Sequence, residues 1–385
     1  MSQGELPPLA RARALAAAIV AASDETERAR RIPEPLLARL HAARLFRMLL
    51  PRSFGGEETH PGQYLAAVEE IARQDASVAW NVFVANSSAL IAAYLEPEAA
   101  RAIFADAATI MAWGPPNASR AIAVDGGYRL GGTWDFASGC RHAAWMGAHC
   151  HVEEADGSLR RNPLGRPCVR TLLFPRGQAT LLDTWNTIGL RGTASDSYSV
   201  SDLFVPEAFS CSREDPTLRR ETGPLYAFTM QGLYAVGVAG VALGIARAML
   251  EAFIALAQKK APRGLARLAD SGVVQADVAR SEASLGAARA YLHETLASIY
   301  ADAMAPIDVE KRARVRLAAT HAIHGAVAVA GVAYRAAGVD AIFPGGPFER
   351  RFRDMHTLSQ QIQARGAHLE AVGQVLLGMP PEPFL

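Results

Sequence analysis

Neither sign of charge is in excess in this sequence of 385 residues. It has 39 lysine and arginine residues against 38 aspartate and glutamate residues, and its formal net charge is +1 at pH 7. A broad positive field, which would attract nucleic acid or an anionic membrane, is therefore not expected. Half of the residues are apolar, and a chain of this length buries them in two or three domains. We expect a globular protein whose partner is a small molecule or another protein.

Cysteine is scarce, with four residues in the chain. Together with the nearby histidines they form no C-x-x-C or H-x-x-x-H pair of the kind that binds zinc, so no metal site is expected. Nothing like a secretory signal opens the sequence, which favours reduced thiols and a cytoplasmic location.

The common nucleotide and hydrolase signatures are also missing. The chain has no G-x-G-x-x-G before a helix, no G-x-x-x-x-G-K-[ST] and no G-x-S-x-G. One long apolar run, 232–250, contains Arg247 and follows Gln231, which favours a buried bundle helix over a membrane span. Neighbouring helices are expected to approach this helix closely at Gly237, Gly240 and Gly244.

Hydrophobic periodicity divides the chain into three parts. It predicts an α-helical domain over 1–108, a β domain over 109–215 and a helical bundle over 216–385. Within the first domain, 33–50 is expected to be one helix. Strands are expected at 128–138, 169–175, 179–189 and 197–206. The bundle is rich in alanine and glycine and buries little area per residue, so we expect a tetramer or dimer, with a monomer as the alternative.

Four stretches, in this α-β-α order, carry a family resemblance: "LLPRSFGGEE", "IARQDASVAW", "YRLGGTWDFASGCRHAAW" with "IGLRGTASDSYSVSDLFVP", and "FERRFRDMHTLSQQ". The chain resembles the acyl-CoA dehydrogenase superfamily, and specifically its two-component flavin-dependent monooxygenases that act on phenols or dibenzothiophene (group D). The resemblance implies a mostly α fold with a central β-barrel or sandwich and a C-terminal four-helix bundle. A homotetramer is the oligomer that we expect.

The resemblance also implies an activity. Such oxygenase components receive reduced flavin from a separate flavin reductase and form a flavin C4a-hydroperoxide with O2. They then pass one oxygen atom to an aromatic, heteroaromatic or polyketide-like molecule. We expect FMN as the flavin, with FAD as the alternative. A dry pocket is needed, because water releases the oxygen as hydrogen peroxide.

The middle domain supplies the expected flavin contacts. Alternation along a strand would place Trp134 and Phe136 on one face, and small Ala137, Ser138 and Gly139 would let the backbone and a hydroxyl touch a planar ring. Ser138 is the expected polar contact at the ring edge. The alternative is that the two aromatic residues are sheet core.

Other cofactor residues are implied by the superfamily alone. The loop after the first strand would follow the flavin ring with Trp113, Gly114 and Asn117, or would be only a stiff turn. Arg263 would reach the flavin phosphate, often across a subunit boundary, or belongs to a solvated basic cluster. A Gly- and Pro-rich loop would approach the cofactor with Phe343, Gly345 and Gly346.

The catalytic positions depart from the superfamily. The glutamate that removes the α-proton in acyl-CoA dehydrogenases corresponds to Ile362 or Tyr234, and neither is a base. The histidine usual in the monooxygenases corresponds to Gln361, which can donate a hydrogen bond but cannot act as a base. His356 is the nearest ionisable group or a structural residue. Arg353 and Asp354 are interpreted as structural.

Trp80 is expected in the substrate pocket. On the same helix, the polar residues Asn86, Ser87 and Ser88 either line this pocket or bond to helix carbonyls. Two other activities stay open. One is a flavin dehydrogenase or oxidase with an unusual substrate, and the other is a catalytically silent flavin-binding subunit.

Overall fold

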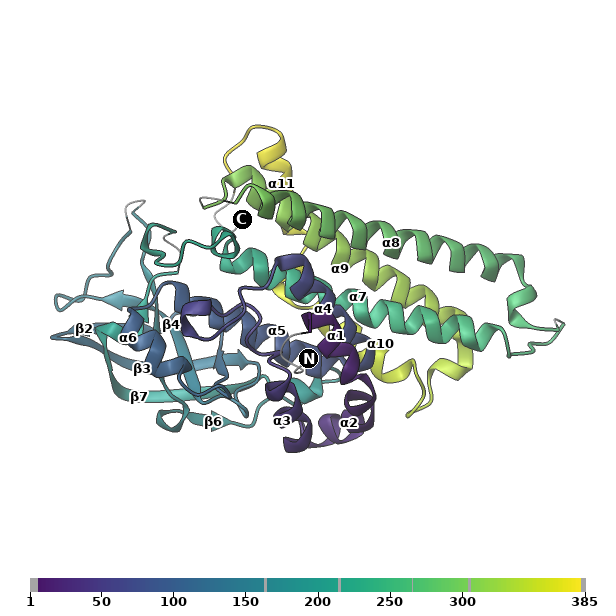
Figure 1. Cartoon of the computed structure of the whole chain (residues 1–385), viewed down its shortest axis with the longest axis horizontal. Helices are drawn as coiled ribbons and strands as arrows, with labels where there is room; N and C mark the ends of the chain where they lie inside the picture. The colour runs from purple at the N-terminus through teal and green to yellow at the C-terminus, as the bar shows by residue number, and fades with distance from the viewer. Residues whose placement is uncertain (1–5, 163–164, 214–215, 265, 304–305, 382–385) are drawn as a thin grey trace.

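The computed structural model describes residues 6–162, 165–213, 216–264, 266–303 and 306–381. Within them, helices pack between and beside a sheet and a long bundle, and the sheet and the bundle occupy opposite ends of the molecule (Figure 1). The first helices are α1 (Pro8–Ala14), α2 (Ala16–Ala29), α3 (Glu34–Ala42), α4 (Pro61–Gln74), α5 (Ala76–Ala89) and α6 (Pro97–Phe104). Residue 215, the predicted end of the middle domain, lies outside the described residues.

The helix expected over 33–50 is shorter than predicted. It ends at Ala42, and Arg44 follows with a φ of 56° in the left-handed region. The next residues form turns whose backbone is bound by Asn86 of α5, which donates to the Leu45 carbonyl and accepts the Leu49 N–H. A side chain 37 residues further along the sequence therefore overrides the helical pattern.

One mixed sheet forms the middle of the chain. Its strands are β1 (Met111–Trp113), β2 (Arg120–Val124), β3 (Gly127–Ala137), β4 (Trp145–Glu153), β5 (Val169–Pro175), β6 (Thr180–Leu182), β7 (Asp196–Pro206) and β8 (Ser210–Cys211). They lie in the order β6-β7-β3-β2-β4-β5-β8, and β1 pairs parallel to β4. The strands predicted at 128–138, 169–175 and 197–206 are confirmed. The one predicted at 179–189 shrinks to β6, and β4 was not predicted.

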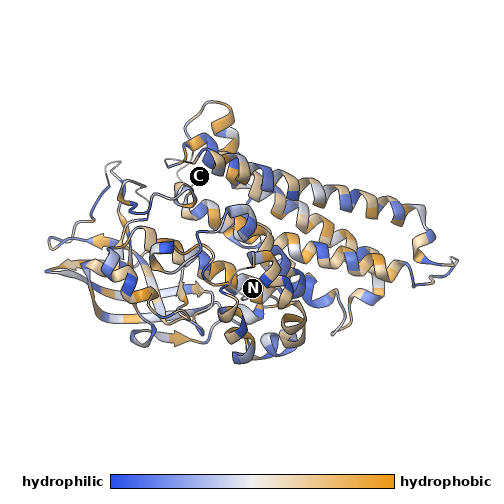
Figure 2. Ribbon diagram, viewed as in Figure 1, coloured by the Kyte–Doolittle hydropathy of each residue, from blue (hydrophilic) through white to orange (hydrophobic). Residues whose placement is uncertain are grey.

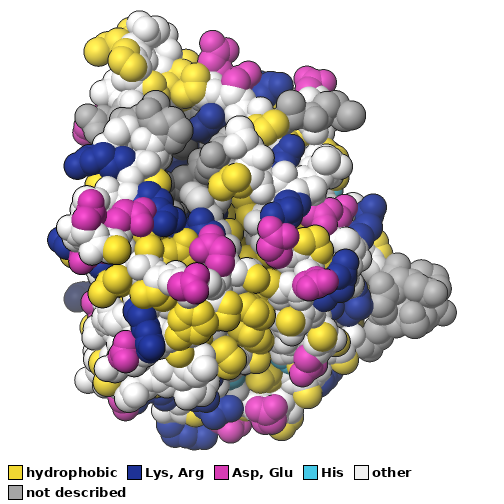
Figure 3. Space-filling view, turned by 90° about the vertical axis from the view of Figure 1, so that its left-hand side faces the viewer, with side chains coloured by type: hydrophobic (Ala, Val, Ile, Leu, Met, Phe, Trp, Pro, Cys, Tyr) yellow, Lys and Arg dark blue, Asp and Glu magenta, His cyan; other side chains and the backbone are white. Residues whose placement is uncertain are grey.

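The sheet end of the molecule carries both charges. On the face shown in Figure 3, acidic and basic side chains are interspersed around apolar ones. Ile122 of β2 and Phe204 of β7 are exposed, and both pair in register with Arg129 of β3. The face shown has no large area of one sign, as expected from the near-zero net charge.

The last part of the chain is built on α7 (Met230–Ala257), α8 (Gly272–Ala301), α9 (Val309–Ala337), α10 (Glu349–Ser359) and α11 (Ala367–Leu376). The helical segments Ala76–Ala93, Met230–Ala257 and Val309–Ala341 are long and apolar enough to span a membrane by length and composition, yet 83% of the apolar window of α7 is buried inside the protein. Figure 2 shows hydrophobic residues along α7 and more hydrophilic ones along α8 at the edge. The predicted buried bundle helix is confirmed.

The glycines of α7 lie against the first helices as expected. A Cβ on Gly237 would be 2.5 Å from Phe83, and one on Gly244 would be 2.4 Å from the Glu69 carbonyl oxygen. A backbone atom cannot move away as a flexible side chain can, so Gly244 fixes the distance between α4 and α7.

We expect Gly244→Ala to lower the free energy of unfolding by about 1–3 kcal/mol, because the methyl group overpacks a rigid contact. Gly286→Ala is the matched control, since Gly286 is also helical but nothing lies within 4 Å of its would-be Cβ. It should raise stability by about 0.5–1 kcal/mol through helix propensity. Thermal melting of both variants checks this, and equal shifts of the same sign would contradict it.

Candidate functional site

Three buried hydroxyl groups form a row where the sheet meets α5. Ser138 follows β3, Ser195 precedes β7, and Thr193 ends the short helix η5 (Arg191–Thr193). The Ser138 and Ser195 oxygens are 2.6 Å apart, and those of Ser195 and Thr193 are 2.7 Å apart. Trp80 of α5 donates its indole N–H to Ser138 Oγ over 3.0 Å. The structure thus brings together Trp80, expected in the substrate pocket, and Ser138, expected at the flavin.

The hydrogen bonds along this hydroxyl row all run in one direction. Thr193 Oγ1 donates to the Leu190 carbonyl oxygen over 2.8 Å, and a hydroxyl has only one proton to give. Thr193 must therefore accept from Ser195, and Ser195 must accept from Ser138. Ser138 donates to Ser195 and accepts from Trp80, which leaves one lone pair on its oxygen. Ser138 offers a ligand an acceptor and no donor.

Asn81 presents a second acceptor beside the row. Its amide nitrogen donates to the carbonyls of Ser77 and Gly192 at 3.0 and 3.1 Å. Its Oδ1 is buried and has no hydrogen-bond partner in the described part of the chain. A Cβ on Gly139 would lie 3.2 Å from this oxygen, and the φ of Gly139 is +79°, which favours glycine. The small residues after Phe136 do bring backbone close to α5.

Trp134 and Phe136 do not share a face of β3, contrary to the prediction. The register of β3 against β7 shifts between Trp134 and Ala137, and Phe136 has a φ of +60°. Such a bulge breaks the alternation of side chains. Trp134 is fully buried, stacks on Tyr198 at 5.4 Å and donates to the His149 carbonyl. It therefore has the alternative role, that of sheet core, and is no wall of the site.

Phe136 instead belongs to an exposed apolar surface beside the hydroxyl row. Phe136 is 61% exposed, and Ile188 is 66% exposed. The Phe136 ring meets Trp185 edge to face at 6.2 Å, and Trp185 donates to the Leu190 carbonyl that Thr193 also binds. Large exposed apolar side chains around polar groups are typical of a binding surface. A flavin contact of Phe136 stays a prediction, and Trp185 and Ile188 are further candidates.

The loop after β1 supplies one ring and two residues with structural roles. Arg213 lies over the half-buried Trp113, 5.5 Å from the ring centroid. A Cβ on Gly114 would be 2.3 Å from a β3 carbonyl oxygen, so no other residue fits there. Asn117 donates to a β3 carbonyl over 2.7 Å and accepts an N–H of its own loop. Gly114 and Asn117 thus hold the loop, and a flavin contact remains predicted for Trp113.

Aromatic rings lead from Ser138 to Gln361. Trp80 and Phe83 have centroids 4.8 Å apart, and Phe83 and Tyr234 have centroids 5.1 Å apart. Burial raises the pKa of the Tyr234 phenol, while a hydrogen bond from the Gln361 side chain lowers that pKa in part. The position matched to a dehydrogenase glutamate, Tyr234, and the position matched to the monooxygenase histidine, Gln361, therefore meet in space.

Gln361 lies just beyond α10, which ends at Ser359. Its Oε1 accepts the Gln363 N–H over 2.6 Å, and this contact orients the amide group. Its Nε2 can then only donate, and donation from Gln361 towards the Tyr234 oxygen lowers the pKa of that phenol. Gln361 is a fixed donor at this end of the site.

His356 and Ile362 are placed differently from Gln361. His356 lies within α10, exposed, with its ring edge on Phe352 at 4.2 Å. Ile362 is exposed and apolar. The contact with Phe352 favours the structural role for His356. A catalytic role of His356 remains a prediction.

Two of the three polar residues predicted for the pocket on α5 are bound to protein groups. Asn86 is fully buried and uses its amide on the backbone of residues 45–49. Ser88 donates to the Val84 carbonyl over 2.9 Å. Ser87 is buried, and its Oγ has no hydrogen-bond partner in the described part of the chain. Helix and loop groups thus satisfy Asn86 and Ser88, which favours the structural alternative for these two residues, whereas the pocket role of Ser87 stays a prediction.

Two loops at the far end of the bundle carry four predicted flavin residues: Arg263, Phe343, Gly345 and Gly346 (Figure 1). An ion pair between Lys260 and Asp340 joins the loops. Helix α7 runs roughly 35 Å from Tyr234 to its end at Ala257. These residues therefore lie far from the hydroxyl row of their own chain. Their flavin contacts stay a prediction that requires a second protomer.

The Arg353–Asp354 pair joins the three parts of the chain. Asp354 accepts the Leu190 N–H over 2.6 Å, and burial raises the pKa of Asp354 to about 7. Arg353 donates to Glu27 and to the Ile188 carbonyl, both at 2.6 Å. The structural interpretation of this pair is confirmed. The pair fixes the loop whose Leu190 carbonyl ends the hydroxyl row.

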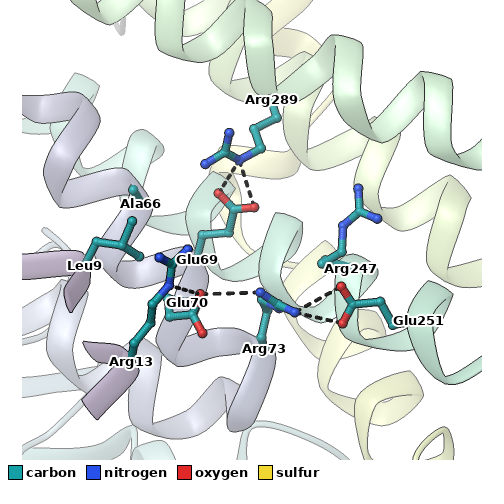
Figure 4. A pocket seen from close by; sticks show the side chains of 9 residues that line it. All are labelled: Leu9, Arg13, Ala66, Glu69, Glu70, Arg73, Arg247, Glu251 and Arg289. Carbon is teal, nitrogen blue, oxygen red and sulfur yellow. Dashed lines mark hydrogen bonds and ion pairs between the residues drawn. The ribbon is translucent and has the colours of Figure 1, made fainter. Parts of the chain in front are cut away.

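A cavity of about 290 Å³ lies elsewhere, between α1, α4, α7 and α8 (Figure 4). Its charged side chains are paired: Glu69 with Arg289 at 2.8 Å, and Arg73 with Glu251 at 2.9 Å. Its lining residues are Leu9, Arg13, Ala66, Glu69, Glu70, Arg73, Arg247, Glu251 and Arg289. It contains no aromatic residue and no hydroxyl group, and we interpret it as an ion-paired junction of helices.

His142 joins the sheet to the first helices and gives a pH prediction. Its Nε2 accepts the Ile32 N–H over 3.0 Å, and burial lowers the pKa of His142 to about 4. The unfolded chain takes up this proton near pH 6.5, so stability should fall as the pH drops from about 6.5 towards 4. Melting at pH 7.5 and pH 5 should show a loss that His142→Gln reduces by a few degrees. The exposed His356→Gln is the control, and the same loss in all three proteins would contradict the assignment.

Sequence reasoning missed Thr193, Ser195 and Trp185 as site residues, although all three lie in or next to the stretch "IGLRGTASDSYS". The run of small residues with hydroxyl groups in this stretch indicates a site. Its contact with Ser138 spans 57 positions and depends on how β7 pairs with β3.

Comparison with known proteins agrees with this arrangement. Residues 9–109 match the model of the acyl-CoA dehydrogenase N-terminal domain, and residues 236–365 match that of the C-terminal domain. Indole-3-acetate monooxygenase of Pseudomonas putida is 30% identical over 93% of this chain and 90% of its own length. The flavin-dependent monooxygenase oxygenase subunit HsaA of Rhodococcus jostii is 28% identical over 87% of this chain and 88% of its own.

Among solved structures, XiaF from Streptomyces in complex with FADH2 and glycerol superposes with a TM-score of 0.90. It is 25% identical and covers 98% of this chain and 97% of its own. The predicted fold, helical at both ends with a central sheet, is confirmed. The chain belongs to the acyl-CoA dehydrogenase family and, within it, to the flavin-dependent monooxygenases.

Proposed function

We propose that this monooxygenase binds reduced flavin, supplied by a separate flavin reductase, at the hydroxyl row and oxygenates aromatic or heteroaromatic molecules beside the rings of α5 and α7. The direction of the hydroxyl row carries the proposal. Ser138 can only accept a further hydrogen bond, and Asn81 Oδ1 is a second buried acceptor without a partner among the described residues. Two acceptors suit a ligand that presents N–H groups.

Reduced flavin fits this requirement better than oxidised flavin. The reduced ring carries a proton on N5, whereas the oxidised ring presents a bare nitrogen acceptor there. Ser138, which can only accept, would then set its lone pair against the lone pair of that nitrogen, and the two would repel. Bound reduced flavin supplies the electrons that activate O2. The chain itself orients the ring through Ser138 and excludes water with the apolar surface of Phe136, Trp185 and Ile188.

The substrate class follows from the residues at the end of the site away from the hydroxyl row. Trp80, Phe83 and Tyr234 offer aromatic edges and faces, and aromatic ligands pack well against such rings. The Pseudomonas relative is named for an indole acid. Polyketide-like rings would suit the same lining. Gln361 would donate a hydrogen bond to a polar group of the substrate.

Dehydrogenation of an acyl thioester is a poorer fit, because Tyr234 and Ile362 occupy the positions matched to the catalytic glutamate. We propose FMN as the flavin, with FAD as the alternative that the FADH2 of XiaF favours. Arg263 would contact the flavin phosphate of a neighbouring protomer in a homotetramer, and Phe343 would line the cofactor pocket there. A cytoplasmic location suits a partner reductase.

Rapid mixing tests the proposal. The protein would be loaded anaerobically with reduced FMN or FAD and mixed with 18O-labelled O2 and aromatic substrates. We expect one labelled oxygen atom in the product and less hydrogen peroxide per flavin than in free solution. Peroxide in full yield, with no labelled product from any aromatic ring class, would favour the silent flavin-binding subunit. Flavin reduced by the substrate without O2 would favour the dehydrogenase.

A further inference from the structure

Arg316 of α9 is a buried cation without an acidic partner. Its side chain is on a residue only 3% exposed, and it donates to the Gln363 amide oxygen. Its Nε has no hydrogen-bond partner among the residues that the structure describes. Charged side chains are rarely buried so far unless they are paired, because the loss of water is costly. The position of Arg316 therefore calls for a negative charge.

Other buried arginines of this chain show what a purely structural arginine looks like. Arg47, 7% exposed, donates to four backbone carbonyl oxygens. Arg11, 3% exposed, forms an ion pair with Glu57 and donates to the Ala43 carbonyl. Arg316 has a single neutral acceptor. The Nε atoms of Arg11 and Arg47 also lack a partner among the described residues, so Arg316 differs from them in that its terminal nitrogens have neither a carboxylate nor several carbonyl oxygens to bind.

A second buried polar group, the hydroxyl of Thr320, lies one turn further along α9. Thr320 is fully buried, and its Oγ1 has no partner in the described part of the chain. One turn further, His324 contacts the Ala364 carbonyl oxygen at 2.8 Å. Arg316, Thr320 and His324 thus turn one face of α9 towards η11 (Ile362–Ala364). Two groups with hydrogen bonds to donate lie on that face.

Arg316 is also connected to the catalytic end of the site. Gln363, its acceptor, donates its N–H to Gln361 Oε1 over 2.6 Å and its amide to Gln231 over 3.4 Å. Gln231 lies one turn before Tyr234 on α7. Arg316 is therefore one residue removed from the Tyr234–Gln361 pair, on the side away from the hydroxyl row.

We propose that Arg316, assisted by Thr320, anchors the carboxylate of an aromatic substrate whose ring lies towards Tyr234 and Gln361. A carboxylate would replace the neutral Gln363 oxygen as acceptor, form paired hydrogen bonds with the planar guanidinium and cancel its charge. The Gln363 amide would keep its bond to Gln231. This inference rests on the proposed function for the ring of the substrate, while the anchor itself needs no flavin.

Binding measurements on the whole protein test the anchor without oxygenation. Three pairs of probes differ only in charge: benzoate and benzamide, phenylacetate and phenylacetamide, indole-3-acetate and indole-3-acetamide. We expect at least one carboxylate to bind roughly 10–100-fold more tightly than its amide by calorimetry, the range of a charge-assisted hydrogen bond. Arg316→Met should abolish this preference, and Arg316→Lys should keep part of it. Arg314→Met, an exposed arginine of the same helix, should leave it unchanged.

Thermal melting separates the anchor from a structural role. Without ligand, Arg316→Met should melt at the same temperature or higher, because it removes an unpaired buried charge. No carboxylate preference in any pair, or a preference that survives Arg316→Met, overturns the proposal. A strongly lowered melting temperature would mean that Arg316 holds η11 in place, and would overturn it too. Failure to bind reduced flavin would count against the proposed function alone.

Discussion

Replacing Ser138 by alanine is expected to raise the hydrogen peroxide released per reduced FMN about tenfold while the protein stays folded. The change removes the acceptor proposed for the flavin and the partner of the buried Trp80 indole N–H. The lost hydrogen bonds, each about 0.5–1.5 kcal/mol, loosen the ring where water must be kept out. Peroxide release after rapid mixing with O2 measures this, and the melting temperature checks the fold.

Thr193 provides the matched pair of variants for the same claim. Thr193→Val keeps the shape but removes the hydroxyl that sets the direction of the row, whereas Thr193→Ser keeps the hydroxyl. The valine variant should leak peroxide in the manner of Ser138→Ala, and the serine variant should behave as the natural protein. If Ser138→Ala leaves coupling unchanged, Ser138 is not part of the site.

Gln361→His is expected to increase turnover of phenolic substrates about 100-fold, the lower range of general base catalysis. An imidazole can take the phenol proton, which the Gln361 amide cannot. The location of Gln361 beside Tyr234, at the end of the aromatic series, places the new base next to the proposed substrate. The rate with simple phenols should also acquire an ionisation near pH 6.5.

Gln360→His controls for this change, because Gln360 is exposed at the end of α10. It should give neither the gain nor the new ionisation. Equal rates in the natural protein and Gln361→His, with unaltered pH profiles, would mean that position 361 does not face the substrate.

The sequence predicts the three-part fold because hydrophobic periodicity is local. It fails where distant residues decide the backbone. The helix expected over 33–50 stops where Asn86 binds the following turns, and the alternation of Trp134 and Phe136 breaks at a bulge set by the pairing with β7. No pattern within one strand reveals either event.

In the candidate site, too, local patterns predict some residues, and contacts between distant residues decide the others. Ser138 could be singled out from its small neighbours, but the row with Ser195 and Thr193 exists only once η5 and β7 are folded against β3. Arg316 has no local signal, because its lack of an acidic partner depends on α9 and η11 together. The flavin contacts predicted for Arg263 and Phe343 would require a second protomer, which one chain cannot supply.

The proposed site requires that the hydroxyl row select reduced over oxidised flavin. Anaerobic equilibrium binding of reduced and oxidised FMN to the natural protein and to Thr193→Val tests it most directly. We predict that the natural protein binds reduced FMN at least about tenfold more tightly and that the valine variant loses most of this preference. Equal affinity for the two forms, or a preference unaffected by Thr193→Val, would contradict it.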